Sequence, residues 1–165
     1  MKKRLVASAF LLVVGSASAA WRADVDRSPM DNKDTLLVYV PARKDSLGRK
    51  SVQDTPTIYI RCSRGDLQIY LRTGTVLERD PQTHIAGRIR YDNAEAESLL
   101  GELSTNYQAI FLAYAREHLD HLLKARRVLI EFTPFRDGKQ IAEFDVTGLD
   151  RHLPLLTQHC RLAKP

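Results

Sequence analysis

The most regular pattern in the chain is two short runs in which apolar and polar residues alternate. Residues 57–62 and 67–73 both alternate in this way and are rich in β-branched and aromatic residues. The polar sequence Ser63-Arg64-Gly65-Asp66 separates them. Two alternating runs around a short turn that contains glycine predict a β-hairpin.

Placing Cys62 opposite Leu67 sets the register of this hairpin and therefore its two faces. Because side chains alternate with a period of two, the apolar residues and Cys62 then share one face, which we expect to be buried. The other face is expected to carry three cross-strand pairs: Tyr59 opposite Tyr70, Arg61 opposite Gln68, and Thr57 opposite Arg72.

Four further runs of β-forming residues predict strands over residues 36–40, 85–91, 128–132 and 141–146. Between the second and third, a helical spacing of apolar residues predicts one long helix over residues 107–125. The segment rich in alanine and glutamate before it allows a short helix around residues 94–103. After Gly148 we expect a terminal helix, capped by Asp150 and with Pro154 in its first turn.

The order of these elements is strands, helix, strands, helix, without the regular βαβ alternation of parallel sheets. We therefore expect an α+β fold: an antiparallel β-sheet or sandwich with one long helix and a C-terminal helix. The segment 21–165 has the length of a single domain, and no internal repeat divides it.

The beginning of the chain has the composition of a secretory signal peptide. Lys2, Lys3 and Arg4 precede a short apolar run, and small residues follow at positions 17–20. The run is too short to span a bilayer, so residues 1–20 are expected to be a cleaved leader. The formal net charge is +5, of which the leader supplies +3. Because the remainder is nearly neutral, the composition does not indicate nucleic-acid binding.

Export matters for the two cysteines of the chain, Cys62 and Cys160. An exported protein reaches an oxidising compartment, in which disulfides persist. Cys62 is expected on the buried face of the hairpin, and Cys160 lies on the apolar side of the terminal helix, in step with Leu153 and Leu156. We therefore expect a structural disulfide, since the spacing does not match a C-x-x-C redox motif.

The sequence offers little support for catalysis or metal binding. His118 and His121 lie three residues apart on the predicted long helix, but on a helical wheel they do not share a direction well. No H-E-x-x-H, G-x-S-x-G, S-x-x-K or P-loop motif is present. We therefore expect a protein that is not an enzyme and needs no cofactor.

The outer face of the hairpin is the candidate partner-binding surface, with Tyr59, Arg61, Tyr70 and Arg72 as its residues. Tyrosine and arginine often anchor recognition surfaces, and an acidic protein or a peptidoglycan strand would suit them. The alternative interpretation is a solvated strand face with stabilising cross-strand tyrosines.

Several short motifs in order along the chain resemble the VasI/TagO family of type VI secretion-associated proteins. The motifs are Ser28-Pro29-Met30-Asp31, Ile60-Arg61-Cys62, Ile69-Tyr70-Leu71, Arg90-Tyr91-Asp92, Phe144-Asp145-x-x-Gly148-Leu149 and the late Cys160. The resemblance implies a non-catalytic accessory protein of the periplasm, docking to a partner protein or to the cell wall. An immunity or inhibitor protein that neutralises a toxin or a wall enzyme is the alternative function.

Overall fold

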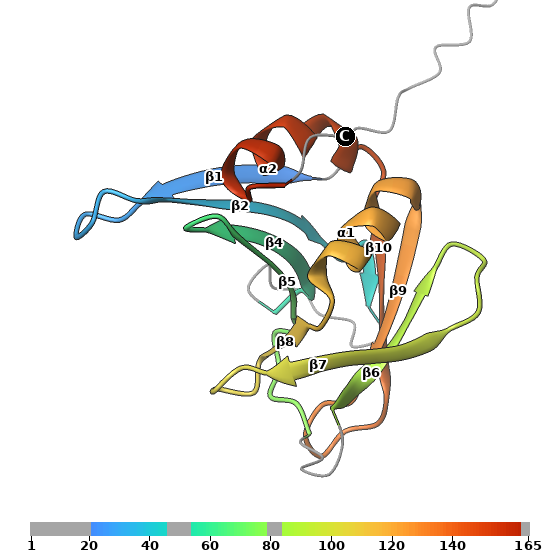
Figure 1. Ribbon diagram of the computed structural model, residues 1–165. Helices are drawn as coiled ribbons and strands as arrows, with labels where there is room; N and C mark the ends of the chain where they lie inside the picture. Colours follow the sequence, from blue (N-terminus) through green and yellow to red (C-terminus); the bar gives the residue numbers. More distant parts are fainter. Residues whose placement is uncertain (1–20, 46–53, 79–83, 163–165) are drawn as a thin grey trace, which may run out of the picture.

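A computed structural model describes residues 21–45, 54–78 and 84–162 (Figure 1). The predicted leader, residues 1–20, lies outside the described residues. The described chain is mainly one antiparallel sheet, with the strand order β1-β2-β4-β5-β8-β7-β6-β9-β10-β3. Its strands are β1 (Arg22–Arg27), β2 (Asp34–Pro41), β3 (Lys44–Asp45), β4 (Thr57–Ser63), β5 (Asp66–Arg72), β6 (Ile85–Tyr91), β7 (Glu97–Leu103), β8 (Ala109–Leu112), β9 (Arg127–Phe132) and β10 (Gln140–Asp145).

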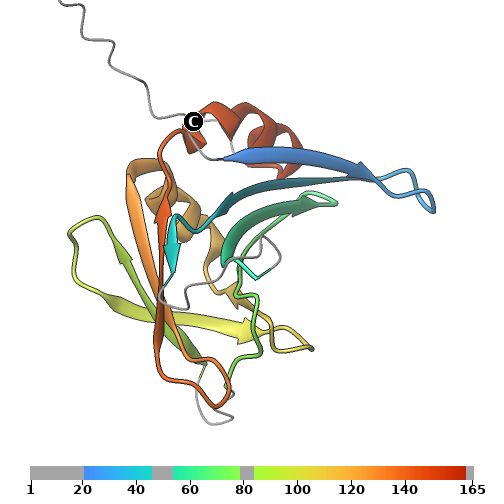
Figure 2. The ribbon, with the colours of Figure 1, turned by 180° about the vertical axis from the view of Figure 1, so that it is seen from behind.

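The sheet curls until its two ends meet. Beyond Pro41 the chain leaves β2, and two residues later it enters β3, which pairs with β10. The backbone N–H of Arg43 donates to the carbonyl of Glu143, at 2.8 Å. The short β3 therefore links the strand nearest one edge to the strand nearest the other (Figure 2). The resulting barrel-like sheet has one inner face and one outer face.

Two helices lie against this sheet. α1 (Ala115–Lys124) contacts β5 and buries Leu119 and Leu122 in the interior. The 3₁₀ turn η1 (Leu149–His152) leads into α2 (Leu153–His159), which contacts β2 and β4. In Figure 1, α2 lies along β1 and β2 at the top of the view, and α1 lies below it, between the strands β4 and β5 and the strands β9 and β10.

The inner face of the sheet holds one continuous apolar core. On β2, β4, β5, β9 and β10, alternate residues are almost completely buried, which is the pattern of a strand with one face in a core. The largest fully buried side chains include Phe132, Phe144, Ile60, Ile69 and Leu71. Burial of this set is the main force that holds the curled sheet together.

The predicted hairpin is present with the predicted register. Cys62 pairs with Leu67, Ile60 with Ile69, and Tyr59 with Tyr70. The predicted disulfide is also present: Cys62 on β4 is bonded to Cys160 at the end of α2, with the two Cα atoms 4.9 Å apart. The strict alternation of the hairpin was sufficient to assign both faces correctly.

The long helix predicted over 107–125 is wrong. Its first part forms β8 and only Ala115–Lys124 is helical. Tyr114 precedes α1 in the left-handed conformation, at φ 54°, which breaks a continuous helix at that residue. β8 pairs with both β5 and β7, so its backbone hydrogen bonds are made across the sheet.

Two other expectations also differ from the structure. The short helix allowed around 94–103 is instead β7, which lies between β6 and β8 and so completes two ladders. Asp150 makes no side-chain cap of the terminal helical segment, which begins after Gly148 at φ 83°. Pro154 does lie in the first turn of α2, as expected.

Candidate binding surface

Four aromatic side chains form a row across the outer face of the sheet, which we call the aromatic ladder: Tyr39, Tyr59, Tyr70 and Phe111. They come from four neighbouring strands, β2, β4, β5 and β8. The strand register aligns them directly, because Tyr39 pairs with Tyr59, Tyr59 with Tyr70, and Tyr70 with Phe111. All four are half-buried. The antiparallel pairing of four strands therefore builds one continuous strip of rings.

The rings of the ladder stack on one another. The Tyr39 and Tyr59 centroids are 5.4 Å apart with the planes at 27°, and the Tyr59 and Tyr70 centroids are 5.0 Å apart at 9°. The Tyr70 and Phe111 centroids are 5.0 Å apart at 34°. These spacings are close to the distance of about 4.8 Å between neighbouring strands. The rings therefore stand upright on the sheet, with each face turned toward the next strand.

Arg61 lies over the end of the ladder. Its guanidinium carbon is 5.7 Å from the Tyr70 centroid and 5.8 Å from the Phe111 centroid, within the range of cation–π contacts. Its Nε and one terminal nitrogen both donate to Oε1 of Gln68, the Nε bond being 2.8 Å long. The two bonds that Arg61 donates to Gln68 hold the guanidinium plane in place above the rings.

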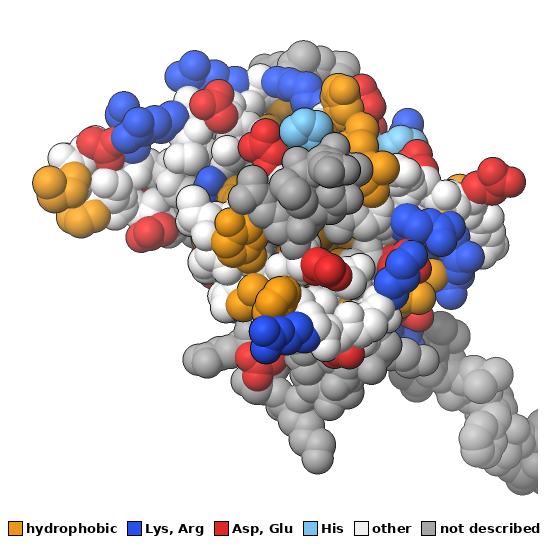
Figure 3. All heavy atoms as spheres, turned by 90° about the horizontal axis from the view of Figure 1, so that it is seen from below, with side chains coloured by type: hydrophobic (Ala, Val, Ile, Leu, Met, Phe, Trp, Pro, Cys, Tyr) orange, Lys and Arg blue, Asp and Glu red, His pale blue; other side chains and the backbone are white. Residues whose placement is uncertain are grey.

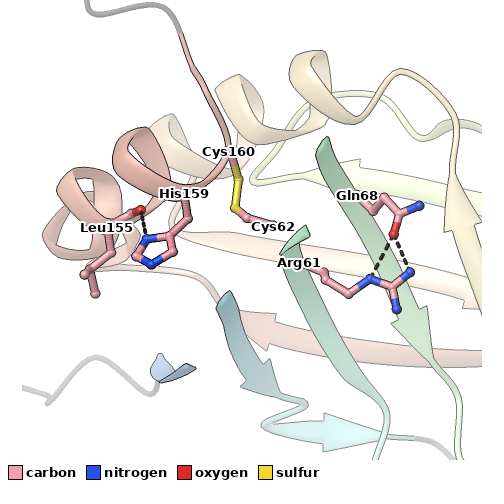
Figure 4. The surroundings of a disulfide bond; sticks show 6 residues. All are labelled: Arg61, Cys62, Gln68, Leu155, His159 and Cys160. Atoms are coloured by element: carbon pink, nitrogen blue, oxygen red, sulfur yellow. Dashed lines mark hydrogen bonds between the residues drawn. A yellow bond between two sulfur atoms is a disulfide. The ribbon is translucent and has the colours of Figure 1, made fainter. Parts of the chain in front are cut away.

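Successive side chains of β4 point to opposite sides of the strand, so the strand that carries the ladder on its outer side is bonded to α2 on its inner side. Figure 4 shows Arg61 and Cys62 pointing to opposite sides of β4, Arg61 toward Gln68 and Cys62 toward Cys160 on α2. The disulfide thus fastens the inner side of the strand whose outer side carries Tyr59 and Arg61. A surface built on a covalently anchored strand is ordered before any partner arrives.

Tyr70 keeps its hydroxyl proton over the physiological range. Burial raises the pKa of its phenol, although the positive charges of Arg61 and Arg72 act against this shift. The hydroxyl at this point of the ladder is consequently a hydrogen-bond donor at neutral and mildly alkaline pH.

The structure brings together three of the four residues that the sequence predicted for this surface. Tyr59, Arg61 and Tyr70 are in one cluster. Arg72 is on the same strand face and half-buried, but it makes no ring contact among the described residues, and its buried Nε has no hydrogen-bond partner there. Tyr39 and Phe111 were missed. The alternation over residues 36–40 could have placed Tyr39 outward, whereas Phe111 lay in the wrongly predicted helix.

A different outer surface, which we call the charged face, covers β6, β9 and β10. Its outward residues have opposite charges on neighbouring strands: Arg88 lies opposite Glu131, and Arg127 opposite Asp145. Glu131 also forms an exposed ion pair with Lys139, at 3.2 Å. β8 and β7 separate β6 from the hairpin, so the arginines of β6 do not extend the aromatic ladder.

The two helical histidines both face Tyr91, contrary to the expectation that they point in different directions. The Tyr91 hydroxyl is 2.7 Å from Nδ1 of His118, and the His121 ring stacks on Tyr91 with 4.9 Å between centroids. Burial lowers the pKa of His118 and raises that of Tyr91. The hydrogen bond between Tyr91 and His118 therefore joins β6 to α1 through two side chains that are uncharged at neutral pH.

An open cleft of about 940 Å³ lies where β6, β7 and β9 end. Its lining carries charges of both signs, from Glu78, Arg88, Glu102, Glu131 and Lys139, together with the imidazole of His84. In the described segments, no three His, Cys, Asp or Glu side chains are grouped so that they could hold a metal ion. The cleft therefore offers less specific chemistry than the aromatic ladder.

Comparisons with known proteins add no relative to this picture. No protein-family model, no curated protein and no solved structure matches the chain. Among the residues that the structure describes, no helix has the length and apolar character needed to cross a membrane.

Proposed function

We propose that this protein is a non-catalytic binding protein of the periplasm that docks to a partner through the aromatic ladder and Arg61. The observation that carries the proposal is the row of four stacked rings on an outer sheet face. Antiparallel strands with one solvated face usually carry polar residues there, whereas here four half-buried rings lie in one contiguous row, and contiguous apolar surface is typical of interaction sites. The disulfide between Cys62 and Cys160 supports an oxidising compartment.

The assignment to a type VI secretion accessory role rests on the resemblance of the short motifs to the VasI/TagO family. Two of those motifs fall on the proposed surface, because Ile60-Arg61-Cys62 supplies Arg61 and Ile69-Tyr70-Leu71 supplies Tyr70. In this role the protein would dock to another envelope component while the machine assembles.

The second candidate function is an immunity or inhibitor protein, and one feature favours it. The β1–β2 hairpin projects from the body of the molecule, and Met30 in its turn is 92% exposed. Figure 3 shows hydrophobic side chains gathered at this free tip, on the left of the view. A protruding apolar tip has the shape needed to plug the active site of a toxin or wall enzyme.

A pull-down from the native envelope tests the proposal and separates the two functions. Wild type is compared with Tyr59→Ala/Tyr70→Ala on the ladder and with Met30→Asp at the hairpin tip. Arg88→Ala/Glu143→Ala on the charged face is the matched control, since it changes two outward residues without changing net charge.

We expect a partner that is retained by wild type and by the control but lost with the ladder variant. Loss only with Met30→Asp, together with recovery of a toxin or wall enzyme, would establish the inhibitor function instead. If all three variants keep the same partners as wild type, the ladder is not the docking surface.

A further inference from the structure

The stacking of the ladder restricts what it can bind. Both faces of Tyr59 and of Tyr70 are covered by neighbouring rings, at 5.0–5.4 Å between centroids. Sugars bind aromatic side chains by lying flat on a ring face, and those faces are occupied here. The two inner rings therefore cannot serve as platforms for a glycan strand.

What the ladder does present outward is ring edges and hydroxyl groups. The edge of an aromatic ring carries the positive part of its quadrupole, whereas the face carries the negative part. Tyr39, Tyr59 and Tyr70 add three phenol groups at the strand spacing, and each hydroxyl can donate a hydrogen bond. Edges and donors of this kind attract an anion rather than a neutral ring.

Arg61 adds a formal positive charge to the same strip. A guanidinium has five N–H donors, and the two bonds to Gln68 use two of them. The donors that remain suit the two oxygens of a carboxylate, which arginine binds in a forked geometry. Arg61 is thus held in position by Gln68 and the rings while it keeps donors for a ligand.

Charges at the border of the ladder define the extent of this anion-attracting strip. Arg22 pairs with Tyr39 at one end, and Glu102 pairs with Phe111 at the other. Asp24 lies opposite Leu37, one outward position further along β2. The positive charges next to Tyr70 are consequently those of Arg61 and Arg72, and the carboxylates of Asp24 and Glu102 border them on two sides.

We propose that the aromatic ladder binds an acidic segment of a partner protein, whose side-chain carboxylates contact Arg61 and the phenol hydroxyls. This inference rests on the proposed docking function and names the chemistry of its partner. It selects a carboxylate-rich polypeptide over the neutral glycan of the cell wall.

The test is a titration of the ¹⁵N-labelled, disulfide-bonded protein, followed by amide chemical shifts. The probes are a short oligo-glutamate peptide, an oligo-glutamine peptide of equal length, and a neutral chitooligosaccharide. We expect oligo-glutamate to shift amides of β2, β4, β5 and β8, with an affinity that falls as salt is added. The oligo-glutamine peptide and the oligosaccharide should leave these amides unchanged.

Matched variants assign the contacts. Arg61→Gln should weaken oligo-glutamate binding by about ten- to a hundredfold, the usual effect of losing a hydrogen bond to a charged group. Tyr59→Phe/Tyr70→Phe keeps the rings and removes two hydroxyls, so we expect a loss of about threefold or more. Arg88→Gln removes the same charge from the charged face and should leave the affinity unchanged.

Three results would overturn the inference: no shifts with oligo-glutamate, equal shifts with Arg61→Gln, or shifts of the ladder amides by the oligosaccharide instead. None of these would remove the docking function, which the envelope pull-down tests separately. If the pull-down fails while oligo-glutamate binds, the surface recognises acidic groups but is not the docking site for an envelope partner.

Discussion

The aromatic ladder and the charged face are two outer surfaces of the same curled sheet, and they are built from strands with the same inner pattern. On β4 and on β9 alternate residues are buried in one core. Outward, β4 presents Tyr59 and Arg61, whereas β9 presents Arg127, Leu129 and Glu131. Since the inner faces follow the same pattern, the two surfaces differ only in the residues that point outward.

The charged face has the composition of a solvated surface. Its opposite charges lie across neighbouring strands, and such exposed pairs add little stability. The aromatic ladder stabilises its strands through ring contacts and also leaves a half-buried strip of rings on the outer face. The comparison indicates that only the ladder combines order, aromatic area and an oriented charge.

Removing the disulfide should cause the largest loss of stability, in the part of the sheet formed by β2, β4, β5 and β8, which carries the ladder. Cys62→Ala/Cys160→Ala opens a covalent loop with a sequence separation of 98, which should lower the free energy of unfolding by about 2–5 kcal/mol. Urea denaturation measures the loss, and hydrogen exchange should show α2 losing protection before β9 and β10. A decrease of less than about 1 kcal/mol in the free energy of unfolding, or an equal loss of protection in α2 and in β9 and β10, would contradict a disulfide that anchors β4.

Truncating a central ring compares the two faces directly. Tyr70→Ala removes two ring contacts, each worth about 0.5–1.5 kcal/mol beyond buried area, so we expect a loss of about 2 kcal/mol. Leu129→Ala, at a half-buried outward position of β9, should cost about 1 kcal/mol. Equal losses in thermal or urea unfolding would show that the ladder adds nothing beyond ordinary area burial.

Lowering the pH should destabilise the fold through His118, which packs against Tyr91 on β6, and not through the aromatic ladder. Burial holds the pKa of His118 in the folded protein below its usual value of 6.5. The unfolded chain therefore binds more protons, so stability is full above about pH 6.5 and falls as the pH decreases below it. We expect the effect to be smaller than that of Tyr70→Ala.

Unfolding of wild type and His118→Gln at neutral and mildly acidic pH measures this dependence. The variant should lose most of the slope between the two conditions, whereas Tyr59→Phe on the ladder should retain it. An unchanged slope in His118→Gln would assign the acid sensitivity to other groups.

The smallest effect is expected from the ion pair of the charged face. Lys139→Ala breaks the exposed contact with Glu131 and should change the unfolding free energy by less than about 0.5 kcal/mol. Added salt should make wild type and variant converge further. A loss comparable to that of Tyr70→Ala would remove the distinction between a solvated face and an ordered one.

The sequence predicted the parts of the fold that have strict alternation, and it failed where pairing partners decide the structure. The hairpin register and the inward direction of Cys62 followed from a period of two. β8 was missed because the spacing of Leu112, Ala115 and Leu119 is helical, yet the edges of β5 and β7 pair with its backbone. β1 is short and mostly exposed, and β7 buries only Leu99 and has leucines on both faces, so the pairing with neighbouring strands defines them more clearly than their own patterns do.

The same division applies to the candidate binding surface. Tyr59, Arg61 and Tyr70 could be placed together because one hairpin contains them all. Tyr39 and Phe111 join them through pairings between strands that are not consecutive parts of the hairpin, because the register places Tyr39 opposite Tyr59 and Phe111 opposite Tyr70. A sequence pattern reports local faces, whereas a continuous strip across four strands depends on the strand order.

The link between Cys62 and Cys160 also sets an order of events in the synthesis of the protein. Cys160 is made 98 residues after Cys62, and all strands from β5 to β10 lie between them. The thiol of Cys62 therefore stays without its native partner until β5 to β10 and α2 have emerged. A chain with one available thiol can cross-link to a neighbouring chain, so an oxidant that acts before Cys160 has emerged would favour dimers over the native bridge.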